Sequence, residues 1–214
     1  MGRYYPVFLD IRGARCVVVG GGGVAARKAE ALLAAGARVT AVAPEFGADF
    51  DALPAAERLT GPYNASVLAG ARVVIAATDD AAVNEAVSRD ARAAGCLVNV
   101  VDRPALGDFI VPATVDRGDL VLAVSTSGAS PALAARVRRD LEAAYPAAYA
   151  EFVALLRRAR WAVQAMIADE AWRKALLTRL AGAEFQALFA SEGAEATWAR
   201  IVRLIADEAE AAGE

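Results

Sequence analysis

The run of residues 16–28 constrains the fold of this chain more than any other stretch. Three consecutive valines are typical of a buried strand, four glycines follow at positions 20–23, and an alanine-rich segment typical of a helix begins at once. A strand that passes through glycines into a helix leaves backbone N–H groups free at the positive end of the helix dipole, where a pyrophosphate binds. Gly20-x-Gly22-x-x-Ala25 fits the dinucleotide spacing, with alanine in the place of the third glycine.

The helix predicted after these glycines completes a βαβ unit. Ala25, Ala29 and Leu32 fall on one face of it, Gly36 provides the C-terminal stop, and residues 38–43 are predicted to form the next strand. No Gly-Lys-Ser/Thr follows the glycines, which argues against a nucleotide triphosphate loop. We therefore predict a dinucleotide at this turn. The alternative is a βαβ unit whose glycine turn binds nothing.

Composition narrows the chemistry. The 214 residues include no histidine, which excludes Ser-His-Asp and Cys-His catalysis and leaves proton transfer to carboxylates, lysine, tyrosine, cysteine or the substrate. With 23 basic and 26 acidic residues we expect no nucleic-acid partner. The apolar stretches are too short to span a membrane and no signal peptide is evident, so we expect a cytoplasmic protein. Cys16 and Cys96 are expected to be buried, reduced thiols.

The α/β alternation continues along the chain. Strands are predicted over residues 72–77 and 96–101, with a helix from about 81 to 94 between them and a short strand over 57–60. This pattern predicts a Rossmann-like, mostly parallel sheet over residues 1–112. Residues 109–115 and 120–125 then flank a turn and predict a β-hairpin, outside the βαβ rhythm.

The rest of the chain is predicted to be helical. Ser130 as N-cap and Pro131 at the first position open a helix that ends before Pro146. We assign residues 113–146 to a region that pairs with another subunit, and residues 147–214 to a small all-helical C-terminal domain of three to five helices.

Candidate site residues follow the predicted strands, because ligands of open parallel sheets bind beyond the strands' carboxyl ends. The second strand does not end in the usual acidic residue that holds the adenosine ribose, and Glu45 is the nearest substitute. No basic residue stands there to meet a 2′-phosphate, which favours NAD over NADP, with Arg38 left as an alternative phosphate contact. Asp102 ends the strand over 96–101 and is our candidate general base, the alternative being a helix or turn cap. We expect Asp79 and Asp80 to cap the following helix and Asn84 to be exposed.

Residues 125–130 form a hydroxyl- and glycine-rich loop before a helix, a second potential anion site. Arginines follow on the next two predicted helices. Most are expected to be solvated surface, and some are candidates for pairing with a polycarboxylate substrate. They are Arg136, Arg138, Arg139, Arg157, Arg158 and Arg160.

These motifs, taken together, resemble the precorrin-2 dehydrogenase/ferrochelatase family, which forms the N-terminal module of siroheme synthase. The resemblance covers residues 4 to about 145. It rests on Tyr-Pro-Val-Phe-Leu-Asp-Ile-Arg-Gly at 5–13, the glycine run with Arg-Lys at 17–28, Ala-Ala-Thr-Asp-Asp at 76–80, Asn-Val-Val-Asp at 99–102, Phe-Ile-Val-Pro-Ala at 109–113 and Val-Ser-Thr-Ser-Gly-Ala-Ser-Pro at 124–131.

The resemblance implies an NAD-dependent oxidation of precorrin-2 to sirohydrochlorin by a homodimer. Asp102 then matches the family's catalytic aspartate, and NAD contacts fall on Gly20, Gly22, Gly23, Val24, Pro44, Glu45 and Thr78. Some members also insert a metal into sirohydrochlorin; this activity and its metal ligands stay open here. Some carry a phosphorylated serine at the position of Thr126. Others are fused to a methyltransferase domain, which we expect to be absent from a chain of 214 residues.

Two other functions stay open from the sequence. One is a non-enzymatic NAD-sensing module, and the other is a Rossmann dehydrogenase of a different small molecule. Neither explains why the Asn-Val-Val-Asp strand end and the hydroxyl-rich loop occur together.

Overall fold

The computed structural model describes residues 4–212 and divides the chain into two compact units, Met1–Val111 and Pro112–Glu214. The division falls where the βαβ rhythm of the sequence stops. Our three-part division of the chain, with its further boundary at residue 146, stays a prediction.

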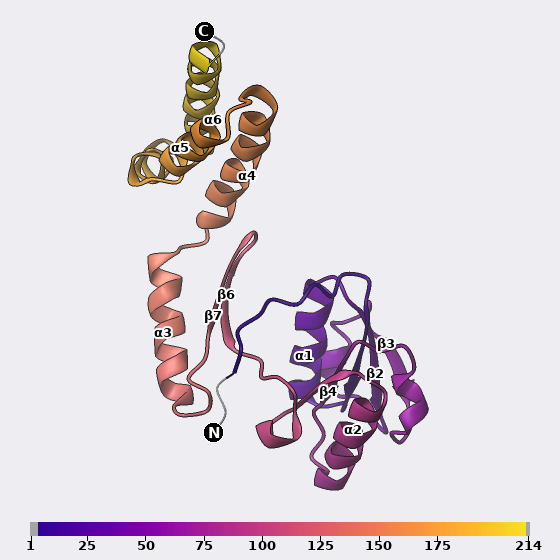
Figure 1. Cartoon of the computed structure of the whole chain (residues 1–214). Coiled ribbons are helices and arrows are strands. Elements are labelled where there is room, and N and C mark those ends of the chain that lie inside the picture. The colour runs from indigo at the N-terminus through magenta and orange to yellow at the C-terminus, as the bar shows by residue number, and fades with distance from the viewer. Residues whose placement is uncertain (1–3, 213–214) are drawn as a thin grey trace. The chain divides into compact units, whose positions relative to one another are not determined.

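The first unit is built on a parallel sheet, as predicted (Figure 1). Its five strands are β1 (Arg15–Val19), β2 (Arg38–Ala43), β3 (Glu57–Thr60), β4 (Val73–Ala76) and β5 (Leu97–Val100). Their order in the sheet is β3-β2-β1-β4-β5. The chain therefore starts in the middle of the sheet, extends to one edge and then to the other, and the switch point between β1 and β4 is where open α/β sheets bind their ligands.

Helices cover both faces of this sheet (Figure 1). Helix α1 (Gly23–Ala34) packs on the face of Val18, Val39 and Ile75, and helix α2 (Ala81–Ala93) packs on the face of Val17 and Val74. Because successive strand residues point to opposite faces, strands buried on both faces must be apolar, as β4 is throughout and β1 is after its first residue, Arg15. Short 3-10 helices occupy connections: η1 (Ala48–Phe50), η2 (Ala65–Leu68) and η3 (Pro104–Leu106).

The second unit holds a hairpin and helices. Its strands β6 (Ala113–Arg117) and β7 (Leu120–Val124) are antiparallel, and α3 (Pro131–Ala144), α4 (Tyr149–Met166), α5 (Glu170–Leu180) and α6 (Ala183–Ala212) follow. Helix α6 is interrupted at Gly193, where the backbone turns left-handed with φ 78°. The helical prediction for residues 147–214 is confirmed over the described residues.

The predicted start of the hairpin at residue 109 is wrong. Residues 109–112 are not in a strand, because the connection is held against β5 instead. The Asp108 N–H donates to the Val98 carbonyl at 2.7 Å, and Asn99 Nδ2 donates to the Phe109 carbonyl at 2.9 Å. The hairpin therefore begins only at Ala113.

The two halves of the second unit differ in packing. Helices α4 to α6 share an apolar core that includes Phe152, Phe185 and Ile201. By contrast, α3 buries none of its residues, and in the hairpin only Val115 is buried. None of the helices in the described residues is both long and apolar enough to cross a membrane.

Candidate active site

The glycine turn closes only because its residues lack side chains. Gly20 has φ 136°, and a Cβ there would lie 2.3 Å from the Ala77 carbonyl oxygen. A Cβ on Gly21 would lie 1.9 Å from the carbonyl oxygen of Glu45. Neither position accommodates any other residue without backbone movement, so these two glycines allow β1, β2 and β4 to end close together around the turn.

Gly22 is different, because it faces open space. No atom lies within 4 Å of the position that its Cβ would take, and Gly22 is the N-cap of α1 without a side-chain hydrogen bond. No acidic residue stands in the first turn of the helix, and Gly23 and the exposed Val24 begin it. The start of α1 therefore has open space beside Gly22 and first-turn N–H groups at the positive end of the helix dipole, an arrangement that suits a pyrophosphate.

The loop after β2 folds back over this turn. Pro44 and Glu45 are exposed, and the Gly47 N–H donates to the Gly21 carbonyl at 2.9 Å. The sequence led us to Glu45 as the acidic residue of this loop, but Asp49 comes nearer to the helix start: its Oδ2 lies 2.6 Å from the position of a Gly23 Cβ. No sequence signal marks Asp49, since even Gly47 before it has a φ of −74°, which any residue adopts.

The end of β4 is held by hydrogen bonds from Asn84, a residue that the helical periodicity of the sequence predicted to be exposed. Asn84 is buried, so our expectation of an exposed residue is wrong. Its Oδ1 accepts from the Thr78 hydroxyl at 2.8 Å, and its Nδ2 donates to the Thr78 carbonyl at 2.8 Å. Asp80 is the N-cap of α2, accepting from the N–H groups of Ala82 and Val83, whereas Asp79 caps nothing within the described chain. Thr78 is thus fixed at the sheet edge.

Asp102 follows β5 with an unusual backbone. It is exposed, and its φ of 61° is in the left-handed region, which few residues other than glycine, asparagine and aspartate adopt. The cap alternative is wrong: η3 has Arg103 at its N-cap and no side-chain capping bond. Within the described residues the Asp102 carboxylate makes no ion pair within 4.0 Å. It is free to act on a ligand.

Strand register brings these groups to one edge of the sheet. Val19 pairs with Val42 and Ala76, and Ala76 pairs with Val100, so the carboxyl ends of four strands are level. Strands lie about 4.8 Å apart, so β1 and β5, separated by β4, end about 10 Å from one another. The glycine turn and Asp102 therefore lie beyond the same edge of the sheet.

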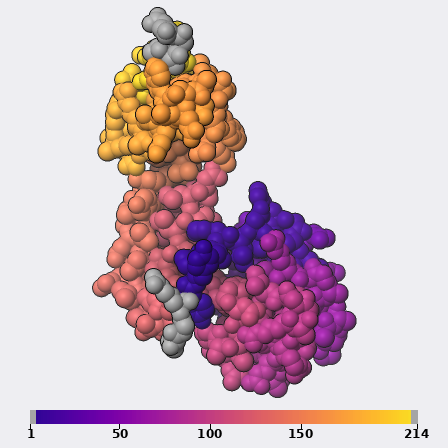
Figure 2. Space-filling model, in the orientation of Figure 1, coloured from indigo at the N-terminus to yellow at the C-terminus, as the bar shows by residue number. Residues whose placement is uncertain are grey.

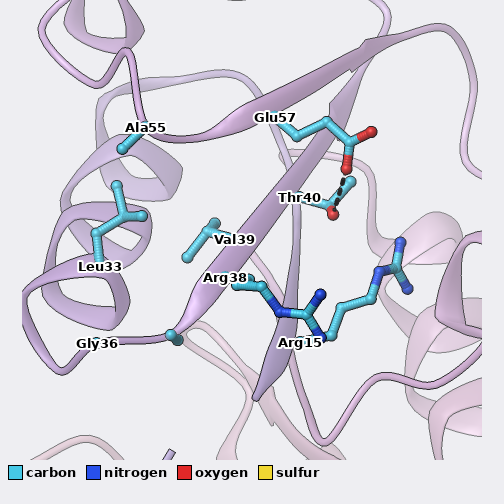
Figure 3. A pocket seen from close by; sticks show the side chains of 9 residues that line it. Arg15, Leu33, Gly36, Arg38, Val39, Thr40, Ala55 and Glu57 are labelled. Carbon is cyan, nitrogen blue, oxygen red and sulfur yellow. Dashed lines mark hydrogen bonds between the residues drawn. The ribbon is translucent and has the colours of Figure 1, made fainter. Parts of the chain in front are cut away.

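A cavity of about 450 Å³ lies at the opposite edge and does not belong to this site (Figure 3). It is lined by Arg15, Arg38 and Glu57, the first residues of β1, β2 and β3. Arg15 donates to the carbonyls of Val67 and Ala69, and Glu57 accepts from the Thr40 hydroxyl at 2.8 Å. These contacts tie strand beginnings to their neighbours.

The remaining candidates take part in the packing and hydrogen bonding of the fold. Cys16 and Cys96 are free and buried, and burial raises the pKa of both thiols, which suits core residues rather than nucleophiles. In the hydroxyl-rich loop, Thr126 Oγ1 accepts from the Ser130 N–H at 3.1 Å, and Ser130 caps α3. The described residues contain no cluster of three or more cysteine and carboxylate side chains that would hold a metal ion.

Several of the candidate arginines already have partners. Arg138 pairs with Glu142, and Arg157 lies 2.9 Å from Asp119. The guanidinium carbon of Arg158 lies 3.9 Å from the centroid of the Trp198 ring. These contacts stabilise the second unit. Arg136, Arg139 and Arg160 are exposed.

The parallel sheet, its switch point and its glycine turn define a dinucleotide-binding α/β protein. Residues 7–113 match the family described as "Putative NAD(P)-binding", and residues 117–144 match "Sirohaem biosynthesis protein central". The chain belongs to this NAD(P)-binding family and is homologous to siroheme synthases.

Relatives align along nearly the whole chain. The siroheme synthase of Chromobacterium violaceum is 42% identical over 215 residues, covering 99% of this chain and 46% of that protein. The siroheme synthase of Thiobacillus denitrificans is 41% identical over 214 residues, covering 97% of this chain and 44% of that protein. The chain thus spans about half the length of these curated relatives. Among solved structures, SirC, a precorrin-2 dehydrogenase, is similar with a TM-score of 0.76 and 27% identity, covering 95% of this chain and 100% of that one.

Proposed function

We propose that this chain oxidises precorrin-2 to sirohydrochlorin with NAD⁺ as the oxidant. The observation that carries the proposal is the unpaired carboxylate of Asp102, which stands at the same sheet edge as the glycine turn. The similarity to SirC over almost the entire chain supports the choice of substrate.

Different residues of the chain are assigned to different parts of the nucleotide. The N–H groups at the start of α1, from Gly22 to Val24, hold the pyrophosphate, and Gly22 keeps the approach clear. Asp49, with Glu45 beside the same loop, accepts hydrogen bonds from the ribose hydroxyls. Its negative charge disfavours a 2′-phosphate, which supports NAD over NADP. Thr78, fixed by Asn84, and Pro44 are assigned further contacts to the nucleotide.

The reaction removes two hydrogens from the substrate. Bound NAD⁺ supplies the acceptor for the hydride, which takes the electron pair of the broken C–H bond. The second hydrogen leaves as a proton, and we assign its acceptance to the Asp102 carboxylate. No histidine is available for this step anywhere in the chain, so a carboxylate exposed beside the nucleotide is the suitable base.

A coupled assay tests the proposal. Purified protein is incubated with precorrin-2 and NAD⁺, and the absorbances of sirohydrochlorin and NADH are followed together. Asp102→Asn keeps the shape and the left-handed backbone but removes the base, so turnover is expected to fall about 10²–10⁴-fold with unchanged NAD⁺ affinity. Asp79→Asn, which removes an exposed carboxylate after the neighbouring strand, is the matched control. Unchanged turnover in Asp102→Asn would remove this residue from the mechanism.

We also propose that the chain works as a homodimer joined through residues 113–146, in the cytoplasm. A two-stranded hairpin is marginal by itself, and here a helix without buried residues accompanies it. A second copy would cover these surfaces. Two buried cysteines that stay unpaired agree with a reducing compartment.

A further inference from the structure

Lys28 is an unusual cation for this chain. Of the 23 basic side chains only two are lysines, Lys28 and Lys174. Lys174 is exposed on α5, whereas Lys28 is partly buried on the second turn of α1, the helix that opens at the glycine turn.

The surroundings of Lys28 are apolar. It lines a cavity of about 120 Å³, and every other side chain of that cavity is a hydrocarbon, among them Ile11, Val73, Ile75 and Phe109. Whole-ligand pockets measure about 300–1,000 Å³, so this one accommodates a single short arm of a ligand. The cavity lies within the first unit, between α1, β4 and the segments that flank the sheet.

The ammonium group of Lys28 has no partner in the described part of the chain. It makes no hydrogen bond there and no ion pair within 4.0 Å. Burial lowers the pKa of Lys28, Arg27 lowers it further, and the carboxylate of Asp102 opposes both by raising it. The cation therefore carries a desolvation cost that Asp102 offsets only in part, and this one anion that acts on it is the proposed catalytic base.

We propose that Lys28 and this cavity form a subsite for one aliphatic carboxylate arm of the tetrapyrrole. The subsite rests on the proposed function, since it assumes that the ring system lies against Asp102. The hydrocarbon walls receive the methylene groups of the arm, and the ammonium donates to its carboxylate. A compact ammonium suits so small a cavity better than a planar guanidinium. Holding one arm at Lys28 orients the ring edge toward Asp102.

The small number of lysines allows a direct test. Reductive methylation with ¹³C-formaldehyde labels Lys28, Lys174 and the terminal amine of the NAD⁺-loaded full chain, and Lys28→Met and Lys174→Met assign the signals. Uroporphyrin III, a stable tetrapyrrole with acetate and propionate arms, is the probe. We expect it to shift the Lys28 signal and to raise the pKa of Lys28 by about one unit or more, because a carboxylate at close range favours the charged form. The Lys174 signal should not move.

Binding to unlabelled variants gives an independent readout. Lys28→Met is expected to weaken uroporphyrin binding about tenfold or more, the effect of losing one charge-assisted hydrogen bond, and to leave NAD⁺ affinity unchanged. Lys28→Arg should recover part of the loss, and Lys174→Met should bind like the parent protein.

The outcomes separate this subsite from the proposed reaction. Uroporphyrin binding with an unmoved Lys28 signal, or undiminished binding by Lys28→Met, would overturn the subsite alone. A Lys28 response together with no oxidation of precorrin-2 would keep the subsite and remove the reaction. Absence of uroporphyrin binding to the parent protein would overturn the subsite and leave the coupled assay to decide the reaction.

Discussion

Strands β1 and β7 are both mostly apolar, but they differ in burial. Strand β1 reads Arg-Cys-Val-Val-Val and buries its last four residues, whereas β7 reads Leu-Val-Leu-Ala-Val and buries none. The difference lies in what covers them: β1 has a strand on each side and a helix layer on each face, while β7 pairs only with β6. An apolar strand thus indicates that a covering layer exists, without telling whether the same chain supplies it. Residues 4–10 share this exposure with β7: in the space-filling view this segment, in the darkest indigo, lies on the outside of the first unit (Figure 2).

The largest expected effect comes from a substitution in the first unit, whose sheet is covered by its own helices. Gly21→Ala forces a Cβ to within 1.9 Å of the Glu45 carbonyl oxygen, so the loop after β2 must move. We expect a loss of about 3 kcal/mol or more in the free energy of unfolding, at the upper end of overpacking costs. Urea denaturation followed by circular dichroism measures it.

Gly22→Ala is the control for that experiment, because nothing lies within 4 Å of its Cβ position. It is expected to cost under about 1 kcal/mol as an N-cap change, yet to weaken NAD⁺ binding at least tenfold, because the methyl group occupies the pyrophosphate approach. Equal instability of the two variants would contradict the division of roles within the turn.

A smaller effect is expected from a substitution in the hairpin, whose strand β7 has no buried residues. Val121 in β7 is 36% exposed and Leu97 in β5 is 37% exposed, so Val121→Asp and Leu97→Asp add the same charge at equally open positions. If residues 113–146 form the subunit interface, Val121→Asp should weaken the dimer about tenfold or more while Leu97→Asp leaves it intact. Sedimentation velocity over a range of concentrations distinguishes them, and equal behaviour would place the interface elsewhere.

The smallest effect concerns Lys28, which lies in apolar surroundings. Because burial lowers the pKa of Lys28, the folded state binds fewer protons there than the unfolded state does, and stability rises with pH between the lowered value and the ordinary value of about 10.4. Lys28→Met should therefore be more thermostable than the parent protein at neutral pH, with an advantage that vanishes above pH of about 10.4. A melting-temperature series in pH checks this. A destabilised Lys28→Met would mean that the lysine supports the fold.

Much of the first unit was predictable because its signals are local. Continuous apolar runs marked β1, β2 and β4, and even the short strand 57–60 was predicted with its observed bounds. Asn84 was not, because its burial comes from hydrogen bonds to Thr78, a partner that helical periodicity cannot reveal. Asp49 was missed for a similar reason: it reaches the glycine turn only after the loop folds back through the bond between Gly47 and Gly21. Contacts made by turns and amides depend on the assembled fold.

The left-handed backbone of Asp102 has a consequence for how this position can vary. Folding alone accepts aspartate, asparagine or glycine there at little cost, whereas β-branched residues would strain the turn. The proposed chemistry accepts only aspartate. A library of all substitutions, scored once for protein abundance and once for turnover, would therefore favour these three residues on the first scale and aspartate alone on the second. The difference between the residues tolerated for abundance and those tolerated for turnover would show how much more strictly catalysis constrains position 102 than folding does.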